Sequence, residues 1–558
     1  MVKIKRHWKI VRGSAVLICS LFLIPLVSYA RSADSLEGIL GQIPVQNGGR
    51  VKPFESFAQE NALLILGKKS FEGLDATTLV WSWLGDPETW GAKPILPVGN
   101  LELRKQFSSD LVNHRLAPTL VLADLNFLKL VRTAQEKQDK KERLTDFEQK
   151  SLDLYHRAST FAEISHGVVP GFIPHPDDAR ISWLPLEAIR SEEGKPILEN
   201  LFPSSLVQNA RSTLTDLLSR LRQRRPAEAV PAAELFASSL RDLLESRSIA
   251  IDESVIHKEL LYLKLKPFHL AWILYLAGII LWLSPRKTKQ AHLIALIVYL
   301  AGFLMHGYGF LLRSLIAGRP PVTNMYESVI WVSWAVVLFA SILWLFYRSY
   351  FIPLVASCVA TFALLIGENL PTVLDPSIAP LVPVLRNNFW LTVHVLTITL
   401  SYGAFALNWG IAHVLLYRLS FVREKKETIA HLTEYLYRSL QIGIILLASG
   451  TILGGVWASY SWGRFWGWDP KETWALIALM CYLTVVHGRI AGWLDEFYVA
   501  FFSAICFLGI LMTWYGVNFV LARGLHSYGF GAGGFPYVSI FVLVDVILLL
   551  FFSRRYKM

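Results

Sequence analysis

The feature that most constrains the fold of this chain is a series of long apolar runs that begins near residue 268. Each run is long enough to cross a hydrocarbon core of about 30 Å as a helix that rises about 1.5 Å per residue. The mean hydropathy of +0.41 and the hydrophobic share of 53% are too high for a soluble protein of ordinary composition. The sequence therefore predicts an all-α polytopic membrane protein.

We expect about nine transmembrane helices in this half of the chain. They are predicted near 268–284, 291–312, 325–347, 351–367, 389–417, 438–459, 472–488, 498–521 and 535–553. Basic residues concentrate in every second connection and at the C-terminal end, with five of them between Arg418 and Arg438. Because cytoplasmic loops carry an excess of Lys and Arg, these connections are predicted to be cytoplasmic. The same pattern explains the net charge of +11 without a nucleic-acid partner.

The first 30 residues have the pattern of a secretory signal. A basic start precedes a short apolar run from Ala15 to Val27, and Ser28-Tyr29-Ala30 follows. Cleavage after Ala30 and retention as a signal anchor are both open. Either way, the segment that begins at residue 31 is predicted to be translocated to the outer side of the membrane.

Residues 31–266 are predicted to form a mostly helical extracytoplasmic domain. Helix-like spacing occurs at 54–66, 115–150, 160–166 and 205–221, and the stretch around 41–53 indicates extended chain with a turn. Thr133–Lys150 is mostly charged and is expected to be one solvated helix, whereas Trp81–Trp90 is expected to be irregular. We find no nucleophile–base pair, metal-ligand spacing or phosphate loop here, so the sequence does not disclose the role of this domain.

The membrane domain, residues 267–558, contains an aromatic loop at 460–471. Its centre, Trp462–Glu472, reads W-G-R-F-W-G-W-D-P-K-E. Asp469 as N-cap, Pro470 at the first helical position and Glu472 two residues later form a strong helix start, so the motif is predicted to begin the seventh span. Tryptophan is also enriched at membrane interfaces without any ligand, and that interpretation stays open at this point.

Two histidines are predicted on the same outer face as the aromatic loop. His394 lies near the outer end of the fifth span, and His526 lies in the last outer loop. Haem iron accepts imidazole nitrogens, its macrocycle needs flat apolar contacts and its propionates need cations. Trp462, Trp466 and Trp468 offer aromatic faces, while Gly463 and Gly467 leave room for a planar ligand. The outer-side cations are Arg464, Lys471, Arg319, Arg386 and Arg523.

The Trp462–Glu472 motif closely resembles the tryptophan-rich signature of the haem-handling cytochrome c assembly superfamily. Flanking stretches agree with that family: F-W-L-T-V-H-V-L-T-I-T-L-S-Y-G-A-F before the motif, then E-T-W-A-L-I-A-L, V-V-H-G-R and G-L-H-S-Y, as well as G-R-P-P-V-T-N-M-Y-E-S from Gly318. The resemblance covers about residues 268–553. It is strongest to the CcsA (ResC-like) component of the system II cytochrome c synthase.

This resemblance implies a bacterial inner-membrane protein that presents haem b at the outer face and joins it to apocytochrome c. It implies that His394 and His526 are axial haem ligands with a catalytic role, and that His487 binds a transmembrane haem. The signature residues Trp462, Gly463, Arg464, Trp466, Trp468 and Asp469 are implied to contact the cofactor.

The resemblance also implies partners. The family's transmembrane haem takes its second ligand from a ResB/CcsB-like subunit, and this chain shows no evident counterpart of that subunit. His306 is predicted at the wrong depth to pair with His487, and His413 has no motif match. Because the substrate thiols must be reduced, an extracytoplasmic thiol-reducing protein is also expected. The alternative functions are a haem transporter or chaperone without ligation chemistry, and a transporter that binds no haem.

Overall fold

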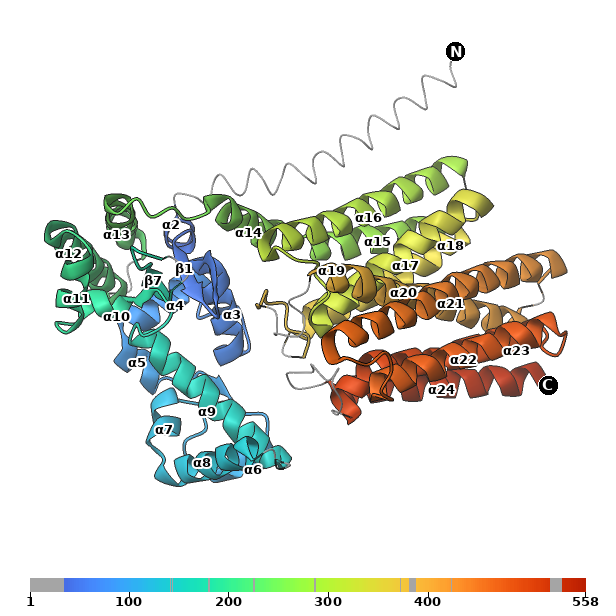
Figure 1. The fold of residues 1–558 in the computed structure, drawn as a ribbon, viewed down its shortest axis with the longest axis horizontal. Helices are drawn as coiled ribbons and strands as arrows, with labels where there is room; N and C mark the ends of the chain where they lie inside the picture. The colour runs from blue at the N-terminus through green and yellow to red at the C-terminus, as the bar shows by residue number, and fades with distance from the viewer. Residues whose placement is uncertain are drawn as a thin grey trace, which may run out of the picture. The chain divides into compact units, whose positions relative to one another are not determined.

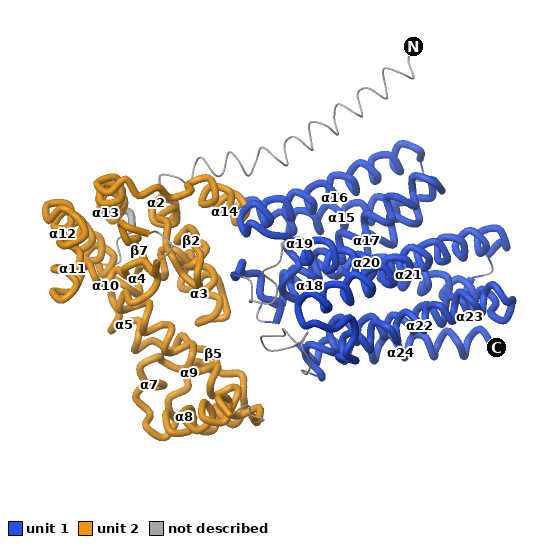
Figure 2. Tube along the Cα trace, viewed as in Figure 1, with its two compact units in different colours: residues 1–21, 265–558 blue, residues 22–264 orange. Residues whose placement is uncertain are grey.

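The computed structural model describes residues 35–140, 142, 144–178, 181–223, 226–285, 288–371, 373–380, 388–422, 424–521 and 534–557. The chain divides into two compact units, residues 22–264 and residues 1–21 with 265–558 (Figure 2). The predicted signal segment, residues 1–30, lies outside the described residues and stays a prediction.

The unit at 22–264 is mostly helical, and its described strands are short. Its helices are α2 (Leu36–Gly41), α3 (Phe54–Leu66), α4 (Ala76–Gly85), α5 (Pro87–Ala92), α6 (Leu101–Gln106), α7 (Pro118–Ala123), α8 (Leu125–Asp139), α9 (Asp146–Ser165), α10 (Leu186–Arg190), α11 (Gly194–Leu201), α12 (Ser204–Arg222) and α13 (Pro226–Ser246), and α14 (Glu253–Leu265) follows. The strands are β1 (Pro44–Asn47), β2 (Arg50–Pro53), β3 (Ser70–Phe71), β4 (Leu74–Asp75), β5 (Leu96–Pro97), β6 (Arg115–Leu116), β7 (Gly171–Ile173) and β8 (Leu184–Pro185). One four-stranded sheet has the order β2-β1-β7-β8, and β1 pairs with β2 as an antiparallel hairpin, which agrees with the predicted extended chain and turn.

Two expectations for this unit were wrong. The segment around Trp81 is helical: the side chain of Asp75 accepts a hydrogen bond from Thr78 N and caps α4, and Asp86 with Pro87 starts α5. Trp81 is buried, with its ring 5.1 Å from that of Phe54.

The expected single helix at Thr133–Lys150 is instead two helices. Helix α8 ends at Asp139, and α9 begins after Thr145, which forms a capping box with Glu148. The local caps decided both cases, because they satisfy the backbone N–H groups of a new helix start.

The second unit is a bundle of long helices (Figure 1). It contains α15 (Pro267–Leu283), α16 (Lys289–Ala317), α17 (Met325–Tyr347), α18 (Phe351–Asn369), α19 (Asn388–Trp390), η2 (Leu391–Val395), α20 (Leu396–Phe421), α21 (Lys426–Trp462), α22 (Pro470–Ile490), α23 (Glu496–Leu511), η3 (Met512–Leu521) and α24 (Phe535–Lys557), where η2 and η3 are π-helical. Within the described part of the chain, nine helices are long and apolar enough to cross a membrane. This confirms the predicted all-α, polytopic membrane fold.

Helix α20 lies at the centre of the bundle, in contact with α17, α18, α21, α23 and α24. Phe405 of α20 stacks on Tyr482 of α22 with ring centroids 3.9 Å apart. Asn408 donates to Leu436 O of α21 at 2.8 Å, and Trp409 donates to Asp545 of α24 at 2.8 Å. These aromatic and polar contacts hold α20 against three neighbours, where apolar packing alone gives little preference for protein over lipid.

Candidate functional site

A cavity of about 360 Å³ lies at one end of the helical bundle, in the unit that holds residues 265–558. Its walls come from the connection at 319–324 with the start of α17, the 373–380 segment, η2, α20, the end of α21, the start of α22, and η3. These segments are far apart in the sequence and meet because alternate helix ends lie at the same end of an antiparallel bundle. The volume lies within the range of about 300–1,000 Å³ that is usual for small-molecule sites.

His394 lines this cavity from the π-helical segment η2. Its Nδ1 lies 2.8 Å from the carbonyl oxygen of Gly450 in α21. A carbonyl only accepts, so Nδ1 carries the proton and Nε2 is the unprotonated nitrogen of the neutral ring. A histidine that ligates a metal is typically held by such a bond to its other nitrogen. π-Helical turns are also frequent at functional sites.

Gly454 gives the His394 ring its room. A Cβ at position 454 would lie 2.6 Å from Cε1 and 3.2 Å from Nε2 of His394. The ring also meets Trp457 edge-on, with centroids 5.7 Å apart. The imidazole is therefore positioned by α21 through a carbonyl, a missing side chain and an aromatic ring.

The tryptophan-rich motif divides between the cavity and the surface. Trp462 is the last residue of α21 and Trp466 follows in the loop, and both line the cavity. Gly463 ends α21 with a φ of +70°, a conformation that glycine adopts without strain. Trp468 has a φ of +56°, is 70% exposed and meets Trp466 edge-on at 5.9 Å. Two of the three predicted aromatic faces thus reach the cavity.

Glu472 fixes the shape of the loop. Its carboxylate accepts from Gly467 N at 2.8 Å and from Asp469 N at 3.2 Å, and it pairs with Arg464 at 3.1 Å. Asp469 is buried and caps α22, which confirms the predicted helix start. Arg464 covers Gly467, where a Cβ would lie 1.8 Å from the guanidinium. Gly467 therefore serves the packing of Arg464 in this structure.

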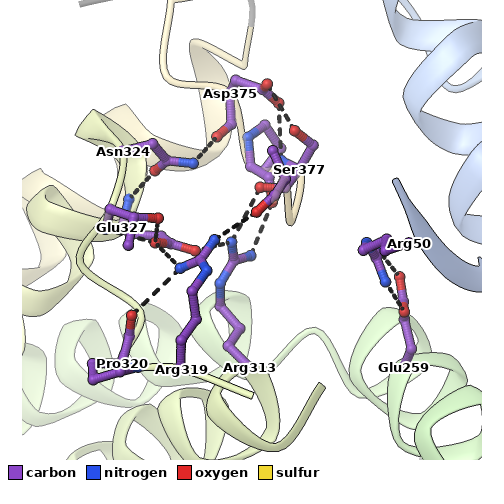
Figure 3. A network of polar contacts seen from close by, with 12 residues as sticks. Arg50, Glu259, Arg313, Arg319, Pro320, Asn324, Glu327, Asp375 and Ser377 are labelled. Atoms are coloured by element: carbon purple, nitrogen blue, oxygen red, sulfur yellow. Dashed lines mark hydrogen bonds and ion pairs between the residues drawn. The ribbon is translucent and has the colours of Figure 1, made fainter. Parts of the chain in front are cut away.

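Behind the cavity, Glu327 binds two arginines (Figure 3). Arg313 donates to one carboxylate oxygen of Glu327 at 2.7 Å, and Arg319 donates to the other at 3.1 Å. Figure 3 shows both guanidinium groups also reaching the segment that contains Ser377; Arg313 donates to Pro376 O at 2.9 Å and Arg319 to Ala379 O at 2.8 Å. Arg319 lines the cavity and shares the Glu327 carboxylate with Arg313, so one negative charge faces two positive ones. The sequence analysis did not predict the network, which holds the 373–380 segment on α16 and α17.

Three other histidines of the membrane unit, His306, His413 and His487, differ in how their ring nitrogens are engaged. His306 uses both: Nδ1 lies 3.3 Å from the Tyr275 hydroxyl and Nε2 lies 3.1 Å from Ile330 O. His413 has Nδ1 at 3.0 Å from Trp409 O, and its Nε2 lies 3.1 Å from Asp545, at ion-pair distance but without a hydrogen bond. His487 is exposed on α22 and bonds Leu483 O through Nδ1 at 2.7 Å. Its Nε2 has no protein partner among the described residues.

Several predicted site residues lie outside the described part of the chain. They are His526, Arg386 and Arg523. In the sequence, His526 follows the cavity-lining Phe519 of η3 by seven residues. Its proposed role therefore stays a prediction.

Sequence reasoning missed part of the cavity wall. Tyr402, Trp457, Trp514 and Asn518 all line it. Trp514 and Asn518 belong to η3, whose π-helical turns change which residues face inward, so an α-helical periodicity does not identify them. Only the glycines at 450, 454 and 455 in α21 offered a sequence signal, because closely spaced small residues in a span mark close packing.

Comparison with known proteins identifies the family. Residues 322–526 match the family model described as cytochrome c assembly protein. The chain is 34% identical over 274 residues to the cytochrome c biogenesis protein CcsA of Prochlorococcus marinus, a match that covers 44% of this chain and 86% of that protein. It is 31% identical to CcsA of Chlorella vulgaris over 39% of this chain and 81% of that protein. The chain belongs to the CcsA family of cytochrome c biogenesis proteins.

A longer relative also matches the unit at 22–264. The protein NrfI of Wolinella succinogenes is 30% identical over 533 residues, which cover 91% of this chain and 56% of NrfI. The chain thus spans little more than half the length of that relative. Membership of the CcsA family assigns this multi-pass membrane protein to cytochrome c biogenesis, a process in which haem is handled.

Proposed function

We propose that the cavity binds haem b as a substrate at the extracytoplasmic face and presents it for covalent attachment to apocytochrome c. The observation that carries this proposal is the position of His394, whose unprotonated Nε2 belongs to a ring that lines a cavity walled by Trp462 and Trp466. Flat aromatic walls and an imidazole nitrogen fit a planar iron macrocycle. His394 and His526 would be the two axial ligands.

The attachment chemistry needs positioning more than acid–base groups. Each thioether forms when a cysteine thiol of the Cys-x-x-Cys-His segment adds across a haem vinyl group: a C–S bond forms, and the hydrogen ends on the other vinyl carbon. No net electron transfer occurs, so the thiols must arrive reduced, which an extracytoplasmic thiol-reducing protein would ensure. The chain's contribution is to hold the macrocycle on the aromatic wall while the substrate's own histidine replaces one axial ligand.

The proposed orientation in the membrane follows from charge. The end of the bundle opposite the cavity carries the basic stretches that include Arg348, Lys425, Lys426 and Arg554. The positive-inside rule therefore favours a cytoplasmic position for that end and an extracytoplasmic position for the cavity.

A second haem position at His487 would need another protein surface. The exposed side of α22 around His487 is largely apolar, with Ile477 39% and Met480 47% exposed. His306 has both ring nitrogens hydrogen-bonded, and the Nε2 of His413 is buried beside the Asp545 carboxylate, so neither offers the missing ligand in this arrangement. An unpartnered ionisable side chain in a membrane is costly and marks a functional position. We infer a ResB-like membrane subunit that covers this side of α22 and supplies the second ligand.

The test is reconstitution with reduced apocytochrome c. The purified chain, alone and with a ResB-like subunit, is loaded with ferrous haem and mixed with a reduced peptide that contains Cys-x-x-Cys-His. Synthase function predicts a haem-peptide that survives denaturing electrophoresis and acid–organic extraction. Haem that is bound and released without thioether formation would instead establish a transporter or chaperone, and failure to bind haem would exclude both.

A further inference from the structure

Lys471 is the cation lining the cavity that forms no ion pair with a carboxylate of the described residues. We propose that its ammonium group, with Asn518, forms a carboxylate subsite that takes one propionate of the bound haem. This inference rests on the proposed function. It means that Lys471 and Asn518 together determine the orientation of the macrocycle.

The other candidate cations are already committed. Arg319 pairs with Glu327 at 3.1 Å and donates to Ala379 O. Arg464 pairs with Glu472 at 3.1 Å and does not line the cavity. Both guanidinium groups are thus held by protein carboxylates, although Arg319 shares Glu327 with Arg313. Among the cations described in and beside the cavity, Lys471 therefore remains.

The side chain of Lys471 makes one weak polar contact, from Nζ to Asn518 Oδ1 at 3.5 Å. No carboxylate oxygen of the described side chains lies within ion-pair distance of its ammonium group. The two acids that line the cavity are used elsewhere: Glu472 binds Arg464 and the loop backbone, and Asp375 accepts from Ser377. An ammonium group has three donors, so Lys471 retains donors for an anionic ligand.

Asn518 orients this lysine. Its Nδ2 donates to Trp514 O one turn earlier in η3 at 3.1 Å, and this bond directs Oδ1 toward Lys471. Lys471 itself lies in the first turn of α22, where the helix dipole adds positive potential. Lys471 is partly buried in a largely apolar cavity, where the nearby Asp469 carboxylate offsets only part of the cost, and a ligand carboxylate would relieve the rest.

The combination of groups defines the ligand class. Trp462, Trp466 and Tyr402 supply apolar faces, His394 supplies an imidazole and Lys471 supplies one positive charge. This set suits a flat, apolar molecule with a carboxylate at one edge. The propionates and the vinyl groups are attached at different edges of haem. Pairing a propionate with Lys471 therefore determines which edge of the macrocycle the incoming thiols meet.

The experiment compares two ligands on the full-length purified chain: ferrous haem b and its dimethyl ester, which lacks the propionate charges. We expect Lys471→Met to weaken haem binding about tenfold, because a charge-assisted hydrogen bond is lost. The same variant should change binding of the ester by less than about twofold, since the ester has no propionate charge. Lys471→Arg is expected to restore most of the haem affinity. Lys426→Met, which removes an exposed lysine at the opposite end of the bundle, is the matched control.

A second variant keeps the test decisive if Lys471→Met does not fold. Asn518→Asp keeps the side-chain shape but gives Lys471 an internal counter-ion, so haem binding should weaken while ester binding persists. Equal losses for both ligands, or no loss for haem, would overturn the subsite. Failure of the proposed function looks different: the unmodified chain would not bind haem, or its haem spectrum would not change in His394→Ala.

Discussion

His394 and His487 are held in the same way but face different surroundings. Each places Nδ1 within 2.8 Å of a backbone carbonyl, so in each neutral ring Nε2 is the unprotonated nitrogen, the one that can bind a metal. His394 lines a cavity built from seven segments of its own chain, whereas His487 is exposed on the surface of α22. The comparison shows that an imidazole with the right orientation does not by itself form a binding site. The binding site of His394 is enclosed by this chain, whereas a binding site at His487 needs walls from another subunit.

The largest expected effect is on the two proposed axial ligands. His394→Ala and His526→Ala should each abolish cytochrome c maturation while the protein still inserts, because the macrocycle loses an axial ligand. Covalent haem staining of a reporter cytochrome c measures maturation, and membrane fractionation measures insertion. Maturation at the unmodified level in both variants would refute the assignment.

The next effect tests whether α21 positions His394. Gly454→Ala adds a methyl group 2.6 Å from His394 Cε1, so the ring must move. Because the imidazole would then be misplaced as a ligand, we expect haem affinity at the cavity to fall at least about tenfold. Gly509→Ala is the matched control, since its new Cβ lies at an ordinary 3.5 Å from Ala478. Haem titration of both variants gives the comparison; equal affinities would mean that the ring is not held by α21.

A smaller effect is expected from His487→Ala in the isolated chain. Because His487 does not line the cavity, the variant should keep the cavity's haem spectrum and affinity within about twofold. In a complex with a ResB-like subunit, the same variant should lose the transmembrane haem. Full bis-histidine ligation at His487 without a partner would contradict the contrast between the two histidines.

The smallest effect is expected within the tryptophan motif. Trp466→Ala removes a cavity wall and should weaken haem binding, whereas Trp468→Ala removes a ring that is 70% exposed and should change affinity less than about threefold. Trp468→Gly also relieves the positive φ at this position and should raise thermal stability slightly. Equal losses for Trp466→Ala and Trp468→Ala would show that the loop rearranges around its ligand.

The sequence was sufficient wherever the decisive signal is local. Apolar length predicted the spans, and Asp469, Pro470 and Glu472 predicted the start of α22, because a cap is formed by residues within one turn of each other. The same local signals were present at Asp75, Asp86 and Thr145, and reading them would have predicted α4, α5 and α9 correctly.

Tertiary structure decided what depends on distant partners. The sequence offered five cations for one anionic ligand, and only packing shows that Glu327 engages Arg319, that Glu472 engages Arg464 and that Lys471 forms no ion pair with the described residues. It also decided which nitrogen of each histidine is used, since Gly450 and Ile330 come from other helices. The physical reason is that local sequence specifies helices and their ends, whereas charge pairing and ring orientation depend on which helices pack together.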